Sequence, residues 1–233
     1  MKPVTLRDTR MIFRLMCGSC SWSYPLLQYA PEKRRFASNR TKMVGRATTL
    51  CVEGFPHSGN TFFVRLIQHW NKDLVLARHM HVPQQVVKAI GNGIPTFVLI
   101  REPAAALSSL LHKYPDLHPW TACLYYHMFY KKIESLRERF VLVRFDAMIK
   151  DPTTYMAQAN QRFGLDLVFE DYNEAIEQAI MRKVPGKVEK HKAASVIKER
   201  RKIEEGLRKM KAFQKACDIH ARYCDTERIP KGL

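Results

Sequence analysis

The sequence predicts an α/β fold with three layers, in which a central parallel sheet lies between helices. Two observations predict this fold. From residue 48 onward, short runs that are apolar throughout alternate with helix-like segments, and such runs are typical of parallel strands buried on both faces. At 233 residues and 46% hydrophobic, the chain is long enough for one large core. We therefore expect one α/β domain over residues 48–233, preceded by a basic, partly irregular N-terminal extension over residues 1–47.

Four short apolar runs are the expected strands, Thr48–Val52, Leu74–Ala77, Pro95–Ile100 and Phe140–Val143. Proline suits the first turn of a helix, so prolines predict helices from Pro83 to Ile90, from near Pro103, and from Pro119 to Arg137. Apolar residues at three- and four-residue spacing predict a further helix after the first strand, with one face formed by Phe63, Leu66, Ile67 and Trp70.

The C-terminal part of the chain predicts one long basic helix from Val196 to Tyr223. Apolar residues recur there at helical spacing against a strongly basic outer face; they are Ile203, Leu207, Met210, Phe213, Cys217 and Ala221.

The formal net charge of +17 is concentrated at the two ends of the chain. Residues 1–47 hold ten Lys or Arg against two Asp or Glu, residues 182–233 hold sixteen against seven, and residues 48–181 hold thirteen against thirteen. A neutral middle with basic ends favours anionic ligands, although solvated tails would explain the same charge. We expect an anionic small-molecule or glycan partner and contact of the basic N-terminus with a membrane surface, and we expect no specific nucleic acid.

Six cysteines are scattered along a chain without a convincing secretory signal, which predicts a reduced, cytoplasmic protein. Cys17 and Cys20 have the spacing of a metal or redox pair, but no second pair or histidine cluster completes a zinc site, so no metal is expected. The apolar stretch over residues 11–27 is interrupted by Arg14 and Gly18, and it falls short of the roughly 20 apolar residues that a membrane span needs.

The segment Gly54–Thr61 has the spacing of a phosphate-binding loop, Gly-x-x-x-x-Gly-Lys-Ser/Thr, with Asn60 at the lysine position. It lies between the first expected strand and a helix, so backbone N–H groups and the helix N-terminus can hold a phosphate. The expected fold is therefore P-loop-like. A loop without the lysine is poorly equipped to neutralise a transferring γ-phosphoryl group, which disfavours hydrolysis of ATP or GTP. A simple glycine turn is the structural alternative.

Polar residues follow the other expected strands. His79 and His81 come after the second strand, and Arg101 ends the third, with Ser109 two helical turns beyond it. The carboxyl ends of parallel strands meet at one edge of the sheet, where ligands bind in such folds. We therefore expect these residues and the loop to line one crevice, in which Arg101 and Ser109 can hold one phosphate.

At these positions the chain resembles the sulfotransferase family, which moves a sulfuryl group from 3'-phosphoadenylyl sulfate (PAPS) to a hydroxyl or amine. The segment Phe55–Thr61 looks like the family's 5'-phosphosulfate loop. Arg101-Glu102-Pro103 with Ser109 is similar to its 3'-phosphate motif, and Val143–Met148 followed by Asp151-Pro152 looks like a strand and turn typical of the family. The order and spacing of the three motifs agree over about residues 48–223.

The resemblance implies a role for each residue. The donor PAPS would be bound by the loop residues and by Arg101 and Ser109; the loop residues are Pro56, His57, Ser58, Gly59, Asn60 and Thr61. The product would be adenosine 3',5'-bisphosphate (PAP). No metal is required, because a sulfuryl group carries less charge than a phosphoryl group. His79–Pro83 resembles the stretch that holds the general base in the cytosolic branch of the family. This makes His81 the expected base, with a pKa suited to neutral pH, and His79 the second candidate.

Two positions depart from the family pattern. His57 stands where the family usually has a lysine or arginine that donates to the leaving oxygen, which predicts slow transfer, transfer favoured at low pH, or none. The basic stretch after Arg182 lies where family members fold a loop over the nucleotide, without that loop's glycine pattern. Lys187 and Arg200 are the candidates there for contact with the 3'-phosphate.

Two other functions compete with sulfuryl transfer to a hydroxyl, such as that of a carbohydrate. A kinase with a phosphate-binding loop would have to work with Asn60 in place of lysine and without an aspartate at the end of Phe97–Ile100. A catalytically weak or inactive sulfotransferase-like protein would bind nucleotide or nucleic acid without chemistry, and His57 favours this alternative.

Overall fold

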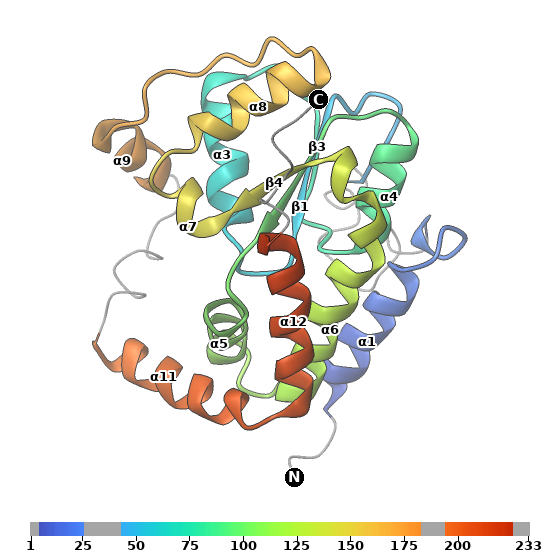
Figure 1. The fold of residues 1–233 in the computed structure, drawn as a ribbon, viewed down its shortest axis with the longest axis vertical. Helices are drawn as coiled ribbons and strands as arrows, with labels where there is room; N and C mark the ends of the chain where they lie inside the picture. The colour runs from blue at the N-terminus through green and yellow to red at the C-terminus, as the bar shows by residue number, and fades with distance from the viewer. Residues whose placement is uncertain (1–4, 26–42, 183–193, 226–233) are drawn as a thin grey trace.

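The computed structural model describes residues 5–25, 43–182 and 194–225. Within these residues, four parallel strands form one sheet in the order β2-β1-β3-β4 (Figure 1). The strands are β1 Leu50–Gly54, β2 Leu76–Arg78, β3 Thr96–Ile100 and β4 Val141–Arg144. The α/β fold with a central parallel sheet is confirmed, and the four strands lie within one or two residues of the expected runs.

Helices lie on both faces of the sheet (Figure 1). Their bounds are α1 Leu6–Cys17, α3 Asn60–Trp70, α4 Pro83–Gly91, α5 Pro103–Lys113, α6 Pro119–Ile133, α7 Phe145–Met148, α8 Thr153–Phe163, α9 Glu174–Arg182, α11 Ala194–Arg208 and α12 Lys211–Asp225. The expected helix Pro119–Arg137 ends early, because its last turns form a tighter 3-10 helix over Glu134–Arg139. No helix in the described ranges is both long enough and apolar enough to cross a membrane.

Each face of the sheet has its own apolar cluster. In β3, which is buried along its whole length, Phe97 and Leu99 point into a cluster with α3 and α8. Val98 and Ile100 point into a cluster with α4, α5, α6 and α12. Successive side chains of a strand alternate between the two faces, so a strand covered on both sides must be apolar throughout. This is why continuous apolar runs located the strands in the sequence.

The order of the strands places a switch point between β1 and β3. From β1 the chain enters α3 on one face of the sheet, whereas from β3 it enters α5 on the other face. The loops after these two neighbouring strands therefore diverge at their carboxyl ends. In open α/β sheets the crevice at such a point is the usual ligand site.

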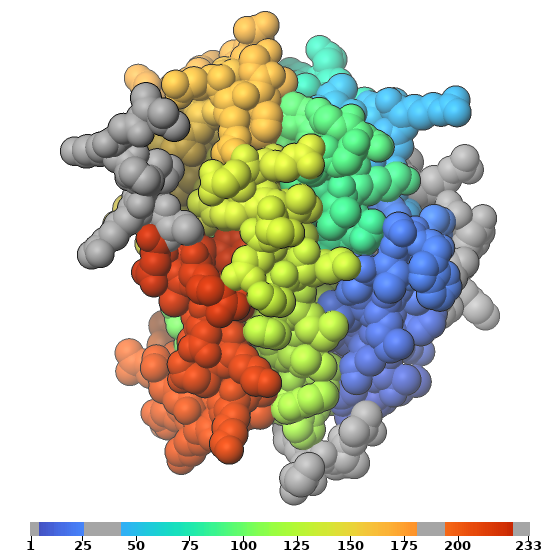
Figure 2. All heavy atoms as spheres, turned by 45° about the vertical axis from the view of Figure 1, so that its right-hand side comes forward, coloured from blue at the N-terminus to red at the C-terminus, as the bar shows by residue number. Residues whose placement is uncertain are grey.

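Part of the N-terminal extension packs against the domain. Thr5 and Asp8 form a reciprocal capping box at the start of α1. The buried Asp8 carboxylate also accepts the His118 N–H at 2.9 Å, which joins α1 to the start of α6. Figure 2 shows α1, α6 and α12 side by side on one face of the molecule. Within this extension, residues 6–17 form a capped helix.

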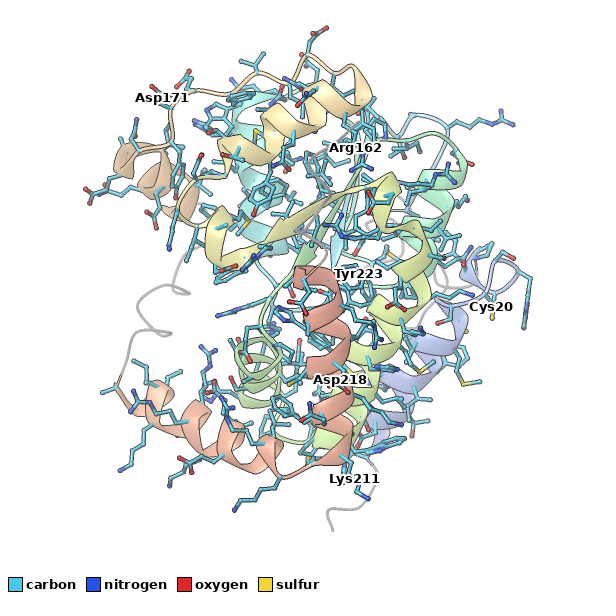
Figure 3. All side chains as sticks on the ribbon, in the orientation of Figure 1. Cys20, Arg162, Asp171, Lys211, Asp218 and Tyr223 are labelled. Carbon is cyan, nitrogen blue, oxygen red and sulfur yellow. The ribbon has the colours of Figure 1, made fainter. Side chains whose placement is uncertain are left out.

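The prediction of one long C-terminal helix is wrong. The chain turns at Lys209 and Met210, where backbone N–H groups bond the carbonyl three residues earlier: Lys209 N to Gly206 and Met210 N to Leu207. The helix before the turn, α11, lies against α5, and α12 runs along α6 (Figure 1). Tyr223 of α12, labelled in Figure 3, donates to the Tyr130 carbonyl of α6 at 2.8 Å. The apolar period continued across the turn because both helices bury one face in the same core.

Candidate functional site

The loop between β1 and α3 leads into the N-terminus of α3 at the switch point. Gly59, the residue before α3, has φ of 91°, which glycine adopts at little cost. A Cβ there would lie 2.8 Å from a ring carbon of Phe145. The N–H groups of Gly59, Asn60 and Thr61 make no hydrogen bond to the described backbone. Three donors at a helix N-terminus form a local positive field suited to an anion.

Two loop residues expected to bind the donor also make bonds within the loop. The Ser58 N–H donates to the Phe55 carbonyl at 3.2 Å, and Asn60 Nδ2 donates to the same carbonyl at 3.0 Å. Both side chains are buried. Asn60 thus supports the loop from inside, whereas a lysine at its position would reach outward to the phosphates. The other predicted loop residues are half-buried: Pro56, His57, Gly59 and Thr61.

Arg101 reaches the loop from the end of β3. Its Nη1 donates to the His57 carbonyl at 2.9 Å, and its guanidinium carbon lies 4.1 Å from the centre of the Phe145 ring. Burial, together with the nearby charge of Arg200, lowers the pKa of Arg101 to about 10, so it stays charged at neutral pH. Within the described chain the guanidinium makes that one hydrogen bond, which leaves further N–H donors for an anion.

His57 connects the loop to α5. Its Nδ1 lies 2.9 Å from the Ser109 hydroxyl oxygen. Ser109 is buried just past the middle of α5, eight residues after Arg101. The structure therefore brings together three of the predicted donor-binding residues, His57, Arg101 and Ser109, from three different segments of the chain.

Of the two predicted C-terminal candidates, Arg200 lies near this group. Its Nη2 donates to the Ala105 carbonyl at 3.0 Å, and its Nε lies 3.4 Å from the Ser108 hydroxyl. Ser108 in turn donates to Glu204 at 2.8 Å. These contacts fix α11 over the helix that carries Ser109. The other candidate, Lys187, lies outside the described residues.

The three predicted catalytic histidines share a strained backbone. His57, His79 and His81 have φ of 65°, 59° and 55°, and they are the non-glycine residues with positive φ in the described chain. Left-handed backbone costs a residue with a Cβ roughly 1–2 kcal/mol. Such strain is concentrated at functional sites, where surrounding contacts hold it in place. The His79 and His81 ring centres are 5.8 Å apart.

The contact of His81 with β1 determines which ring nitrogen can act as a base. His81 Nδ1 lies 2.8 Å from the Gly54 carbonyl oxygen. A carbonyl only accepts hydrogen bonds, so Nδ1 carries the proton and Nε2 carries the lone pair. This tautomer is the one a general base acting through Nε2 requires.

The pKa of His81 differs from the value expected from the sequence. Burial lowers the pKa of His81 to about 3, with smaller contributions from the nearby groups His79, Arg14 and His57. The ring is therefore neutral at pH 7 but a weaker base than the neutral-range pKa expected from the sequence. The physical reason is the partial burial of the ring, with Arg14 nearby as a cationic group. An anion bound in the crevice would raise this pKa, because a negative charge favours the imidazolium.

Glu53 is a site residue that the sequence reasoning missed. It lies in β1 and is fully buried. Its carboxylate accepts the N–H groups of Met80 and His81 at 2.7 and 2.9 Å and the Gln85 side-chain amide at 2.8 Å. Burial raises its pKa to about 7, although the hydrogen bonds from the backbone oppose the shift. A single carboxylate inside an apolar strand was the available signal, since buried charges are rare without partners.

Three tyrosines of α6 were also missed. The hydroxyls of Tyr125, Tyr126 and Tyr130 donate to the carbonyls of His81, Arg101 and Leu99 respectively. These carbonyls belong to the ends of β2 and β3 or to the loops just beyond them. One buried helix thus holds the histidine turn and the end of β3 with its following loop. Three tyrosines within six residues of an apolar helix were the sequence signal.

The chain matches no model of a known protein family, and comparison with curated proteins found no significant match.

Proposed function

We propose that the protein transfers a sulfuryl group from PAPS to the hydroxyl of an acceptor, giving PAP and a sulfate ester. The observation that carries the proposal is the group formed by Arg101, Ser109 and His57 beside the start of α3. It offers two neighbouring positions for anions, one at the helix N-terminus and one at the guanidinium. A donor with a phosphosulfate at its 5' end and a phosphate at its 3' position needs two such positions.

The charges around Arg101 support an anionic ligand. Burial lowers the pKa of Arg101, and the nearby charge of Arg200 lowers it further. Two like charges held together away from water cost free energy until a counter-charge binds between or beside them. A 3'-phosphate would supply that charge. In this proposal Ser109 donates a further hydrogen bond to it.

The proposed transfer requires one proton acceptor. The acceptor oxygen attacks sulfur, the bond from sulfur to the phosphate oxygen of PAPS breaks, and the hydroxyl proton passes to His81 Nε2. The negative charge that develops on the leaving oxygen falls near the start of α3, where N–H groups stabilise it. In this proposal His57, when it is protonated, donates to the leaving oxygen.

The phosphate-binding loop disfavours a kinase, because Asn60 stands at its lysine position. Asn60 Nδ2 is bound to the Phe55 carbonyl inside the loop, so this position cannot provide the cation that stabilises a transferring γ-phosphoryl group.

We propose an anionic or glycan acceptor because the chain is strongly basic. The six cysteines are free thiols, which suits the cytoplasmic setting we propose.

The donor site is tested by thermal unfolding with PAP or with ADP and Mg²⁺. At about 100 times its Kd, a ligand stabilises by roughly 2.7 kcal/mol, which raises Tm by about 5–10 °C in a chain of this size. We expect PAP to give this shift and ADP to give little. Arg101→Ala should lose the response, whereas Arg46→Ala, an exposed arginine before β1 at the opposite edge of the sheet, should keep it. Equal shifts by both nucleotides in all three proteins would contradict the proposal.

Transfer itself is tested with His81→Ala. Since a general base contributes roughly 10²–10⁴-fold, we expect the rate of PAPS conversion to PAP to fall by about that factor while the PAP-induced Tm shift remains. His69→Ala, at the far end of α3, is the control and should convert PAPS at the normal rate. If the unchanged protein is stabilised by PAP but converts no PAPS with any acceptor tried, the domain binds the nucleotide without chemistry.

A further inference from the structure

The turn that carries His79 and His81 is held by side chains from three other elements. Its four central polar backbone groups are the N–H and carbonyl groups of Met80 and His81. Glu53 of β1 accepts both N–H groups, at 2.7 and 2.9 Å. Arg14 of α1 donates to the Met80 carbonyl at 2.6 Å, and the Tyr125 hydroxyl of α6 donates to the His81 carbonyl. Every one of these four groups therefore has a side-chain partner.

The Glu53 carboxylate is itself fixed in orientation. The Gln85 side-chain amide donates to one of its oxygens at 2.8 Å, and the Tyr24 hydroxyl donates to the amide oxygen of Gln85. Glu53 and Gln85 are both fully buried. A buried carboxylate with three N–H donors has little freedom to rotate. It can therefore serve as a template for the two consecutive N–H groups of the turn.

This arrangement acts on His81 through its backbone. Both flanking histidines of the turn are in the left-handed region, a conformation that is uncommon for residues with a Cβ. In that conformation His81 Nδ1 lies 2.8 Å from the Gly54 carbonyl. If the backbone relaxed, this bond would lengthen or break, and both neutral tautomers of the ring would become populated.

We propose that Glu53 is a positioning residue that fixes the His81 tautomer by holding the strained turn, and that Arg14 holds the same turn from its carbonyl side. The role of the fixed tautomer in sulfuryl transfer rests on the proposed function. The effect of Glu53 on the tautomer of the His81 ring does not depend on that function. The N-terminal helix is then part of the site, because Arg14 joins α1 to the turn. Glu53 and Arg14 do not touch the reacting groups; they act through the backbone of Met80 and His81.

Glu53→Gln is the first test. Glutamine keeps the shape of glutamate but places an NH₂ group where one carboxylate oxygen was, so at least one N–H group of the turn faces another donor. In ¹⁵N NMR spectra of the imidazole rings, assigned by the loss of a signal in His81→Gln, the unchanged protein should show one His81 tautomer with the proton on Nδ1. Glu53→Gln should show an exchange average of both tautomers and a His81 pKa closer to 6.5, its ordinary value.

Arg14→Gln covers the case in which Glu53→Gln does not fold. It removes a contact from α1 and leaves the sheet intact, and we expect the same change in tautomer to a smaller extent. Arg10→Gln is the matched control, because Arg10 lies one turn earlier on the same helix and is exposed. It should leave the His81 spectrum unchanged.

Kinetics give a second readout. Misplacement of a catalytic group by about 1 Å can cost on the order of 100-fold, so we expect kcat for PAPS conversion to fall roughly 10- to 100-fold in Glu53→Gln, with the PAP-induced Tm shift retained. A proton on Nε2 in the unchanged protein, or an unaltered His81 spectrum in both variants, would overturn the proposal. A chain that converts no PAPS would refute the proposed function and leave the NMR result to decide the role of Glu53.

Discussion

At the residue scale, backbone strain is concentrated at the site. In the described chain, residues with a Cβ and positive φ are limited to His57, His79 and His81. These are the same three residues that the sequence predicted as catalytic, on grounds unrelated to backbone conformation. Strained residues persist where many contacts hold them. Here Arg101 holds the His57 carbonyl and Glu53 holds the His79–His81 turn.

Gly59 allows a prediction that separates steric clash from backbone strain. Gly59→Ala would place a Cβ 2.8 Å from the Phe145 ring and 2.9 Å from Met148 Cε, at φ of 91°. Gly164 also has positive φ, 63°, but open space around it. We expect Gly164→Ala to cost about 1–2 kcal/mol for the left-handed backbone alone, and Gly59→Ala to cost roughly 1–3 kcal/mol more because of the clash.

Urea unfolding of both variants measures the difference. Gly59→Ala should also lose the stabilisation by PAP, whereas Gly164→Ala should keep it. Equal losses of stability in the two variants would show that Phe145 and Met148 move aside without cost.

The Glu53 and His81 pair predicts an unusual dependence of stability on pH. The pKa of Glu53 is raised from 4.5 to about 7, so its contribution to stability is lost as the pH rises through this range. The pKa of His81 is lowered from 6.5 to about 3, so its contribution is lost as the pH falls through that range. Between pH 4.5 and 6.5 the two slopes oppose each other. The pair should therefore contribute little pH dependence there.

His81→Gln removes one of the two opposing slopes. We expect its free energy of unfolding to fall as the pH rises from 4.5 to 7, by up to about 3 kcal/mol, since each pKa unit corresponds to about 1.4 kcal/mol. The measurement is urea unfolding at several pH values. The double variant with Glu53→Gln is the control and should be flat again. A flat profile in His81→Gln alone would mean that the Glu53 pKa is not raised in the folded state.

At the element scale, α1 is joined to the domain by a buried carboxylate. Asp8 caps its own helix through Thr5 and accepts the His118 N–H at the start of α6. Burial opposes ionisation, yet hydrogen bonds from Thr5, Thr121 and His118 lower the pKa of Asp8 to about 2. The group is therefore charged when folded at neutral pH. Its contribution to stability is present above 3.8, its ordinary pKa, and is lost as the pH falls towards 2.

Asp8→Asn should destabilise the protein by about 1–3 kcal/mol at pH 7, because an amide cannot accept all of these hydrogen bonds. The expected fall in Tm is roughly 2–12 °C for a chain of this length. Asp116→Asn is the control: Asp116 bonds Arg7 on the surface, where it is half exposed, and exposed pairs contribute up to about 1 kcal/mol. Equal Tm values for the two variants would contradict the anchoring role of Asp8.

The sequence predicted the strands and several helix starts, but it missed the break between α11 and α12. Apolar runs located the strands, because a strand covered by helices on both faces has no polar face. Prolines 83, 103 and 119 located three helix starts. The break at Lys209 and Met210 was missed, since α11 and α12 each continue the same apolar period. Only their packing on two different helices, α5 and α6, required the turn.

At the scale of the whole molecule, one sheet separates two apolar clusters. Leu99 and Ile100 are consecutive residues of β3 that point into opposite clusters, and both are almost fully buried. Because the two clusters share the same strands, neither can lose its packing without disturbing the other. The molecule should therefore unfold in one step.

Leu99→Ala and Ile100→Ala test this coupling. Each should lower the free energy of unfolding by about 2–5 kcal/mol, with the same midpoint by far-UV and near-UV circular dichroism. Val168→Ala, which alters a residue that is 61% exposed, is the control and should change stability by less than about 0.5 kcal/mol. Different midpoints from the two probes would indicate that the clusters unfold separately.

The sequence by itself determined the parallel sheet between helices, the loop Gly54–Thr61, and the placement of Arg101 and the histidines at strand ends, because periodicity, glycine and proline act locally. The tertiary structure decided how these groups are held. It buried Asn60 inside the loop, set Arg200 near Arg101, and surrounded the turn at His81 with Glu53 and residues of α1 and α6. Burial, tautomer and charge environment depend on contacts between residues distant in the chain, and local patterns do not contain them.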